Sequence, residues 1–285
     1  MKIAITTETT ADLTKELLER FDIKTIPLKV ILGDKQYNDG DLTNEEIFAY
    51  VEKTGILPKT NAVNESEFDE FFENLLKEYD AVVHISLSSE ISCTYQNAVS
   101  SAKKFEKVYV IDSRSLSTGV GMQAIYAREV AKKFDDPEKV VELVEARKDK
   151  VQASFIVERL DYLYKCGRCS GFQLLGANLL KLRPRIVVKD GKMSSDKKFR
   201  GSMDKAVRKY CQDCLNEFFN IDKSMAFITF PNATPEMIQA AREELESVGV
   251  KNIFTTTAGG TITSHCGEHT LGILYYNDGL NTLEN

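Results

Sequence analysis

Apolar strands alternate with amphipathic helices along almost the whole chain, and this alternation limits the fold more than any other feature. Predicted strands at residues 2–7, 81–87, 108–112, 152–157 and 225–230 are each followed by a segment with helical periodicity. Units of this kind build α/β domains, in which helices flank a β-sheet. With 285 residues, 42% of them hydrophobic, the chain can bury one large or two moderate cores. We predict two α/β domains, residues 1–150 and 151–285.

Three segments interrupt the alternation. Pro27 falls near the start of the apolar run 26–32, so a strand with an irregular beginning is expected there. Residues 57–64 lack periodicity and are predicted to form a loop. Residues 258–270, rich in Gly, Thr and Ser, predict a polar connection before the last strand. Asp190-Gly191, in contrast, predicts a hairpin with a two-residue turn.

Charge and hydropathy argue against two classes of function. The net charge is −6, with Lys and Arg scattered along the chain, so the basic footprint of a nucleic-acid-binding protein is missing. No apolar run approaches the ~18 residues that span a bilayer. The first residues, Met1-Lys-Ile-Ala-Ile-Thr6, enter a strand and do not resemble a signal peptide. We therefore expect a cytoplasmic protein without a stable membrane anchor.

Hydroxyl side chains gather where the strand at 81–87 meets the next helix, expected at about residues 92–105. They are Ser88, Ser89, Ser92 and Thr94. The first turn of a helix has unpaired N–H groups and the positive end of the dipole, so such a boundary can bind a carboxylate or phosphate. The alternative is that Ser92 only caps its helix, since Ser is among the commonest capping residues.

Six cysteines occur without secretory features, which favours free thiols over disulfides. Two pairs, Cys166 with Cys169 and Cys211 with Cys214, have a spacing that could supply four thiolates to zinc. The 41 residues between the pairs exceed the ~15–20 of a common zinc ribbon. Moreover, Cys211 and Cys214 fall three residues apart in a predicted helix, which favours core packing. A zinc or thiol protein that uses these four cysteines is thus a less favoured alternative.

Six short motifs occur in a characteristic order. They are Lys2-Ile-Ala-Ile-Thr-Thr-Glu-Thr-Thr-Ala-Asp-Leu13, Pro58-Lys-Thr-Asn61, Ser92-Cys-Thr-Tyr-Gln96, Ile111-Asp-Ser-Arg-Ser115, Leu163-Tyr-Lys-Cys-Gly-Arg-Cys-Ser170 and Ser264-His-Cys-Gly267. Together they resemble the DegV family, bacterial fatty-acid-binding proteins that include the binding subunits of fatty acid kinase. The resemblance covers nearly the whole chain.

This resemblance implies a two-domain fold with a long-chain fatty acid in an apolar tunnel between the domains. Thr60 and Ser92 match the family's hydroxyl ligands of the carboxylate, and His265 matches a histidine of the same network. Asn61 stands where a serine usually follows the threonine, and its amide can still donate a hydrogen bond. Arg168 matches an arginine linked to phosphotransfer. In the family, a separate ATP-dependent kinase of the DAK type phosphorylates the carboxylate, so no catalytic residue and no cofactor are expected here.

Other residues depart from the family pattern. Glu8 stands in place of the usual Asp, Cys93 in place of the glycine after Ser92, and Cys166 in place of the first glycine before Arg168. If position 93 lines the carboxylate pocket, the Cys93 side chain narrows it. Apolar residues in 172–182 are candidates for the tunnel wall.

The predicted set of hydroxyls, an amide, a helix end, an arginine and a histidine suits anion binding. A serine-dependent acyl hydrolase or transferase is a second alternative, with His265 as the base for Ser92. It fits less well, because no carboxylate is evident to orient His265 and no Gly-x-Ser-x-Gly elbow is present. His84 and His269 are expected to be structural.

Overall fold

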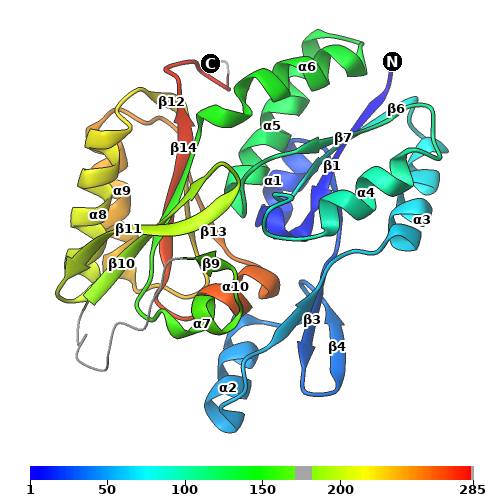
Figure 1. The fold of residues 1–285 in the computed structure, drawn as a ribbon. Helices are drawn as coiled ribbons and strands as arrows, with labels where there is room; N and C mark the ends of the chain where they lie inside the picture. The colour runs from blue at the N-terminus through cyan, green and yellow to red at the C-terminus, as the bar shows by residue number, and fades with distance from the viewer. Residues whose placement is uncertain (171–181, 284–285) are drawn as a thin grey trace.

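The structure, a computed structural model, describes residues 1–170 and 182–283 (Figure 1). These residues form a four-stranded, a seven-stranded and a three-stranded sheet, with helices against the two larger ones. The predicted α/β class is confirmed. Within the described ranges no helix is long and apolar enough to cross a membrane.

The four-stranded sheet is entirely parallel, in the order β2-β1-β6-β7. Its strands are β1 (Ile3–Glu8), β2 (Ile23–Ile26), β6 (Ala81–Ser86) and β7 (Val108–Asp112). Every residue of β1 and β6 is buried, as expected for a parallel sheet covered on both faces. Alternate residues contact opposite faces: Ala4 and Val82 pack in one hydrophobic cluster, whereas Ile5 and Val83 pack in another.

Five helices lie near this sheet: α1 (Lys15–Arg20), α3 (Glu65–Leu76), α4 (Thr94–Ala102), α5 (Thr118–Lys133) and α6 (Pro137–Arg147). Helices α3 and α4 cover one face of the sheet through Phe68, Phe72 and Ala98. Helices α5 and α6 pack against the other face. Helix α4 lies close to its predicted position at about residues 92–105.

The seven-stranded sheet is mainly antiparallel, in the order β13-β12-β14-β8-β10-β11-β9. Its strands are β8 (Val151–Ile156), β9 (Cys169–Ser170), β10 (Leu182–Lys189), β11 (Lys192–Arg200), β12 (Ile221–Phe230), β13 (Ile253–Thr257) and β14 (Leu271–Asn277). Helices α8 (Met203–Glu217) and α9 (Pro235–Ser247) cover one face. Strands β10 and β11 form the predicted hairpin, in which Asp190 and Gly191 both have positive φ, as a two-residue type I′ turn requires.

The two large sheets share a hydrophobic cluster. Phe227 and Leu274 of the seven-stranded sheet belong to the same cluster as Ile5 of the parallel sheet and the buried side chains of α5. Helix α5 contacts β1 and β6 as well as β8 and β14. The predicted division into residues 1–150 and 151–285 separates the two large sheets. It stays a prediction, because the shared hydrophobic cluster contains residues from both sides of the boundary.

Three local predictions were wrong. The apolar run 26–32 is not one strand: β2 ends at Ile26, and β3 (Lys29–Leu32) belongs to the three-stranded sheet β4-β3-β5. Pro27 lies at the break because it has no N–H to continue the ladder. The predicted loop 57–64 contains β5 (Lys59–Asn61), which is too short to show a period. The remaining strand of this sheet is β4 (Lys35–Asn38).

The third error is α10 (Gly260–Cys266), which forms within the predicted polar connection 258–270. Its inward-facing side chains are hydroxyls, so the usual apolar period is missing. Ser264 Oγ donates to the Gly260 carbonyl at 2.6 Å, and Thr263 Oγ1 donates to Asn44 Oδ1 at 2.8 Å. These bonds satisfy the buried hydroxyls of Thr263 and Ser264.

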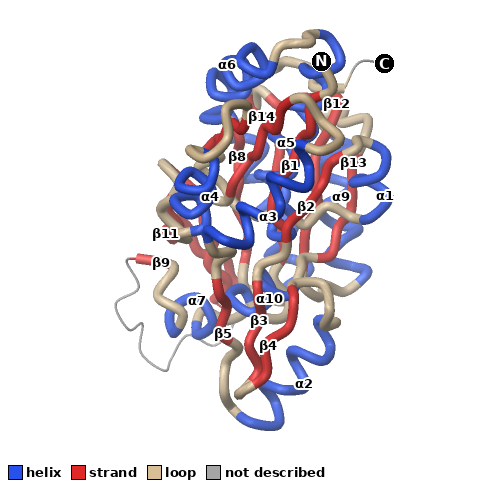
Figure 2. Tube along the Cα trace, turned by 90° about the vertical axis from the view of Figure 1, so that its right-hand side faces the viewer, coloured by secondary structure: helices blue, strands red, loops and turns tan. Residues whose placement is uncertain are grey.

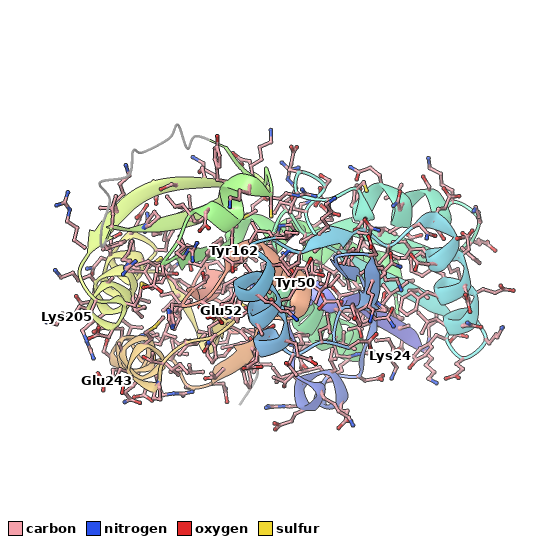
Figure 3. The ribbon with its side chains drawn as sticks, turned by 90° about the horizontal axis from the view of Figure 1, so that it is seen from below. Lys24, Tyr50, Glu52, Tyr162, Lys205 and Glu243 are labelled. Carbon is pink, nitrogen blue, oxygen red and sulfur yellow. The ribbon has the colours of Figure 1, made fainter. Side chains whose placement is uncertain are left out.

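Helix α10 brings the C-terminal part of the chain back to the first half. It packs against α2 (Asn44–Thr54), β3, β5 and α7 (Asp161–Lys165), which gather at one end of the molecule (Figure 2). Asn44 also donates to the carbonyls of Pro231 and Ala258, at 2.8 and 2.9 Å. Seen from this end, α2, which carries Tyr50 and Glu52, lies centrally between α8 and α9 on one side and the parallel-sheet half on the other (Figure 3).

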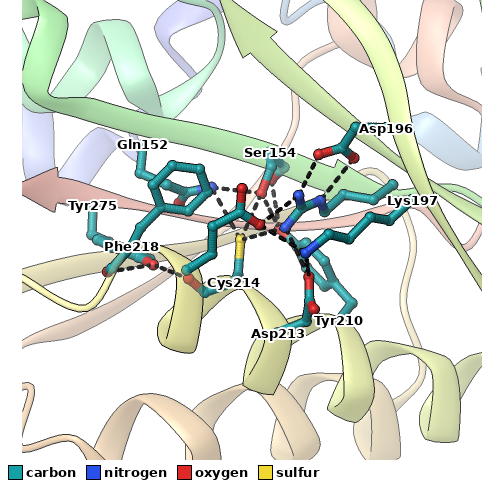
Figure 4. A network of polar contacts seen from close by, with 11 residues as sticks. Gln152, Ser154, Asp196, Lys197, Tyr210, Asp213, Cys214, Phe218 and Tyr275 are labelled. Atoms are coloured by element: carbon teal, nitrogen blue, oxygen red, sulfur yellow. Dashed lines mark hydrogen bonds and ion pairs between the residues drawn. The ribbon is translucent and has the colours of Figure 1, made fainter.

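A buried ionic cluster lies between α8 and the β10–β11 hairpin (Figure 4). Arg185 is fully buried and forms ion pairs with Asp196, Asp213 and Glu217. Burial alone would lower its pKa, but the hydrogen bonds that the guanidinium donates to Asp196 and Glu217 raise the pKa of Arg185 overall. The guanidinium therefore stays charged and fixes the hairpin to the helix.

Cys211 and Cys214 are both buried in the core beneath α8, as their helical spacing predicts. Burial raises the pKa of Cys214 to about 11, so its thiol is protonated at neutral pH and is a poor metal ligand. Cys166 lies elsewhere, beside Arg168 in a surface pocket. In the part of the chain that the structure describes, no group of three or more His, Cys, Asp or Glu side chains could hold a metal ion. The zinc alternative is not favoured.

Candidate functional site

A pocket of about 440 Å³ lies where β5, the β6–α4 connection, α7 and α10 meet. Part of its wall is apolar and consists of Leu28, Leu87, Ile91, Leu116, Leu163, Met193 and Ile262. All of the predicted site residues also line it: Thr60, Asn61, Ser92, Arg168 and His265. The β6–α4 connection is at the carboxyl end of a parallel strand, the edge where α/β folds usually bind ligands.

Thr60 and His265 form the polar centre of this pocket. Thr60 Oγ1 lies 2.9 Å from His265 Nε2, joining β5 to α10 across 205 residues of sequence. Burial, together with the positive charge of Arg168, lowers the pKa of His265 to about 4. The imidazole is therefore neutral at pH 7. If Nε2 carries the proton and donates it to Thr60 Oγ1, the threonine O–H is free to donate to a ligand.

The second ring nitrogen of His265 is also available. Its Nδ1 is buried and has no hydrogen-bond partner among the described residues. Buried polar atoms in native proteins are nearly always paired, so an orphan beside a pocket is a sign of a missing ligand or water.

Ser92 both supports the start of α4 and lines the pocket. Its Oγ accepts a hydrogen bond from the Thr94 N–H at 3.2 Å and lies 2.8 Å from Thr94 Oγ1. Cys93, the residue that precedes the helix, makes no capping bond with its side chain. Ser92 is therefore not the N-cap residue of α4, but its hydroxyl accepts a hydrogen bond from the first helical N–H and remains part of the pocket wall.

The other predicted residues lie nearer the solvent. Arg168 is exposed and follows Gly167, whose φ of +66° ends α7. Its Nη1 donates to the Cys166 carbonyl at 2.7 Å. Asn61 is exposed at the rim, where Nδ2 reaches Gln36 Oε1 at 3.4 Å. Cys93 also lines the pocket and is exposed. The candidate wall segment 172–182 lies, except for its last residue, outside the described residues.

A buried carboxylate holds the end of β6 beside the pocket. Glu8 is fully buried and accepts hydrogen bonds from Ser86 Oγ at 2.6 Å and the Leu87 N–H at 2.9 Å. His84 Nε2 lies 3.1 Å from the same carboxylate, and His84 Nδ1 lies 2.8 Å from Thr6 Oγ1. His84 is therefore structural, as predicted. Glu8 at the family's Asp position orders the strand end from which the Ser92 loop departs.

Two aspartates that the sequence analysis did not single out fix the start of α10, and with it His265. The Gly259 N–H donates to Asp12 Oδ1 at 2.7 Å. A Cβ at position 259 would come within 2.8 Å of Asp39 Oδ1, so only glycine allows this approach. Burial raises the pKa values of both Asp12 and Asp39. The sequence signal for Asp12 was the short motif Lys2–Leu13, which contains it.

The described geometry does not assemble a hydrolytic triad. Ser92 Oγ is bonded to Thr94 and His265 Nε2 to Thr60, and no hydrogen bond joins Ser92 to His265 within the described residues. His265 Nδ1 has no described carboxylate to orient it. The serine-dependent alternative is therefore not favoured.

Helix-flanked parallel and mixed sheets, with an apolar pocket that opens through a polar mouth, define an α/β protein suited to binding an amphipathic small molecule. A family model described as "Uncharacterised protein, DegV family" matches residues 2–278. The chain belongs to the DegV family.

Individual relatives agree over the full length. The chain is 31% identical to a DegV domain-containing protein from Caldanaerobacter subterraneus, covering 96% of this chain and 98% of the relative. It is 29% identical to a protein from Thermotoga maritima named a fatty acid-binding protein, over 95% and 96% of the two chains. A solved structure of a DegV family protein from Thermus thermophilus, described for fatty acid binding, superposes with a TM-score of 0.89 at 27% identity, covering 97% and 100%.

Proposed function

We propose that this protein binds one long-chain fatty acid, with the tail against the apolar wall and the carboxylate at the polar mouth. The observation that carries the proposal is the pairing of Thr60 with a neutral His265 at the edge of an apolar pocket. The names of the Thermotoga and Thermus relatives point to the same class of ligand. In this proposal the ligand lies between two domains, residues 1–150 and 151–285.

The carboxylate would be held by groups that need no charge of their own. Thr60 and Ser92 supply hydroxyl donors, Asn61 an amide, and His265 a neutral imidazole that orients the Thr60 hydroxyl. Hydrogen bonds to an ionised acceptor are roughly twice as strong as neutral ones, so several such donors suffice to orient the head group.

The tail would dominate the affinity. Burying about fourteen methylenes at ~0.8 kcal/mol each gives on the order of 10 kcal/mol before ordering costs. The pocket volume of about 440 Å³ falls within the usual range for small-molecule sites. A ligand held in this way should remain bound through purification.

We further propose that the bound carboxylate is presented to a separate ATP-dependent kinase of the DAK type in the bacterial cytoplasm. Arg168 suits contact with the incoming phosphoryl group, because it is exposed at the mouth of the pocket and a guanidinium pairs well with phosphate. The chain itself would be a non-catalytic binding subunit that needs no cofactor.

Two variants separate these roles. Delipidated Ser92→Ala should bind a titrated fatty acid more weakly than wild type. Arg168→Ala should bind the fatty acid normally and fail mainly in phosphorylation by the kinase. Equal fatty-acid affinity in wild type and Ser92→Ala, with unchanged circular dichroism, would remove Ser92 from the carboxylate site.

A further inference from the structure

A second pocket, of about 420 Å³, adjoins the first one and has a different character. Both pockets are lined by Thr60, Asn61, Arg168 and His265. The rest of the second pocket comes from residues 55, 57 and 58 before β5, from Lys59 at the start of β5, and from Lys165 and Cys166 at the end of α7. The hydrogen-bonded Thr60–His265 pair is therefore common to the two spaces.

The second pocket concentrates positive charge. Lys59, Lys165 and Arg168 line it, and no Asp or Glu is among its lining residues. His265 adds no charge at neutral pH, since its pKa is about 4. This is unusual in a chain whose net charge is −6. The first pocket, in contrast, has Glu90 in its wall.

The two lysines are not committed to other partners. The ammonium groups of Lys59 and Lys165 form no ion pair or hydrogen bond with a described residue, whereas the ammonium groups of Lys104 and Lys197 each contact two carboxylates. The positive field of the second pocket is therefore not cancelled locally, and a small multivalent anion fits it best.

We propose that this cationic pocket, lined by Lys59, Lys165 and Arg168, holds the phosphoryl group of an acyl phosphate whose tail occupies the apolar pocket. The inference rests on the proposed function, because it requires a carboxylate at the Thr60–His265 pair. A phosphoryl group added to that carboxylate extends away from the tail, and the shared lining makes the cationic pocket the adjacent space. Lysine ammoniums serve as point charges for phosphate, and the guanidinium adds a planar fork.

The test compares two ligands of one chain length, hexadecanoic acid and a hydrolysis-resistant hexadecanoyl phosphonate, on delipidated protein. The double variant Lys59→Gln/Lys165→Gln should bind the phosphonate about tenfold more weakly, from roughly threefold for each ion pair made by these exposed lysines. Its affinity for the fatty acid should stay within about twofold of wild type. The matched control is Lys53→Gln/Lys103→Gln, which removes the same charge at exposed positions that line neither pocket and should leave both affinities unchanged.

The outcomes distinguish this inference from the proposed function. Equal phosphonate affinity in wild type and the Lys59/Lys165 variant, or an equal loss in the control, would overturn the inference while fatty-acid binding stands. Titration of inorganic phosphate onto fatty-acid-loaded protein tests whether the cationic pocket binds free phosphate and not the phosphoryl group of an acyl phosphate. Lysine-dependent binding of phosphate, with no lysine effect on the phosphonate, would assign the pocket to free phosphate and also overturn the acyl phosphate assignment. Wild type that binds neither long-chain ligand would refute the proposed function itself.

Discussion

The substitution Thr60→Val tests the polar mouth most sharply, because it replaces one hydroxyl by a methyl group of similar size. It removes the Oγ1 that lies 2.9 Å from His265 Nε2 and, in the proposed complex, a hydroxyl donor to the carboxylate. A hydrogen bond to a charged group contributes about 1.5–3 kcal/mol. Fatty-acid affinity should therefore fall by roughly 10- to 150-fold.

Calorimetric titration of delipidated protein measures this change. Thr25→Val is the matched control, since Thr25 is a strand residue of β2 that lines neither pocket described above. The control should bind like wild type. Wild-type affinity in Thr60→Val, within about twofold, would refute the argument that the Thr60–His265 pair holds the head group.

Three further predictions concern pH, the buried arginine and the thiols. The pKa of His265 is about 4 in the folded protein, below the usual 6.5, so as pH falls the unfolded chain takes up this proton first and the free energy of unfolding decreases between pH 6.5 and 4. In His265→Asn, the free energy of unfolding measured in urea should depend less on pH over that interval. The same pH dependence in the variant and the wild type would contradict this prediction. Arg185→Met should cost about 3 kcal/mol in urea unfolding, because it removes the ion pairs of a buried guanidinium and leaves Asp196 without one. Arg208→Met, which breaks pairs of an exposed guanidinium, should cost under about 1 kcal/mol, and equal costs would contradict this. Peptide mapping after brief treatment with a maleimide should show that exposed Cys93 is modified well before buried Cys211 and Cys214. Bound fatty acid should slow the modification of Cys93, because Cys93 lines the pocket. Faster labelling of Cys211 and Cys214 than of Cys93 would refute this prediction.

Local sequence patterns predicted those elements whose stability comes from their own residues. The strand β6 is rich in Val and Ile, α3 has a clear amphipathic face, and Asp190-Gly191 is sufficient for its turn. Helix α10 was missed because its buried side chains are hydroxyls whose partners include Asn44, 219 residues away. The buried Glu8–His84 and Arg185 clusters were missed for the same reason, since polar residues in strands give no sign of distant partners.

The candidate site shows the same limit. Short motifs identified Thr60, Ser92 and His265 through a family resemblance, and the structure brings them to one pocket. No local pattern predicts that β5 and α10 meet, or that burial keeps His265 neutral. The cationic lining of the second pocket was also not predicted, because Lys59 and Lys165 belong to segments far apart in the chain.

The central claim is that one fatty acid occupies this protein, and native mass spectrometry of the freshly purified chain tests it most directly. The account predicts a mass excess equal to one fatty acid per chain, identified after organic extraction and absent from delipidated protein until fatty acid is added back. Protein at its bare mass, with no lipid in the extract and none taken up when offered, would contradict the account and leave only the family and the fold.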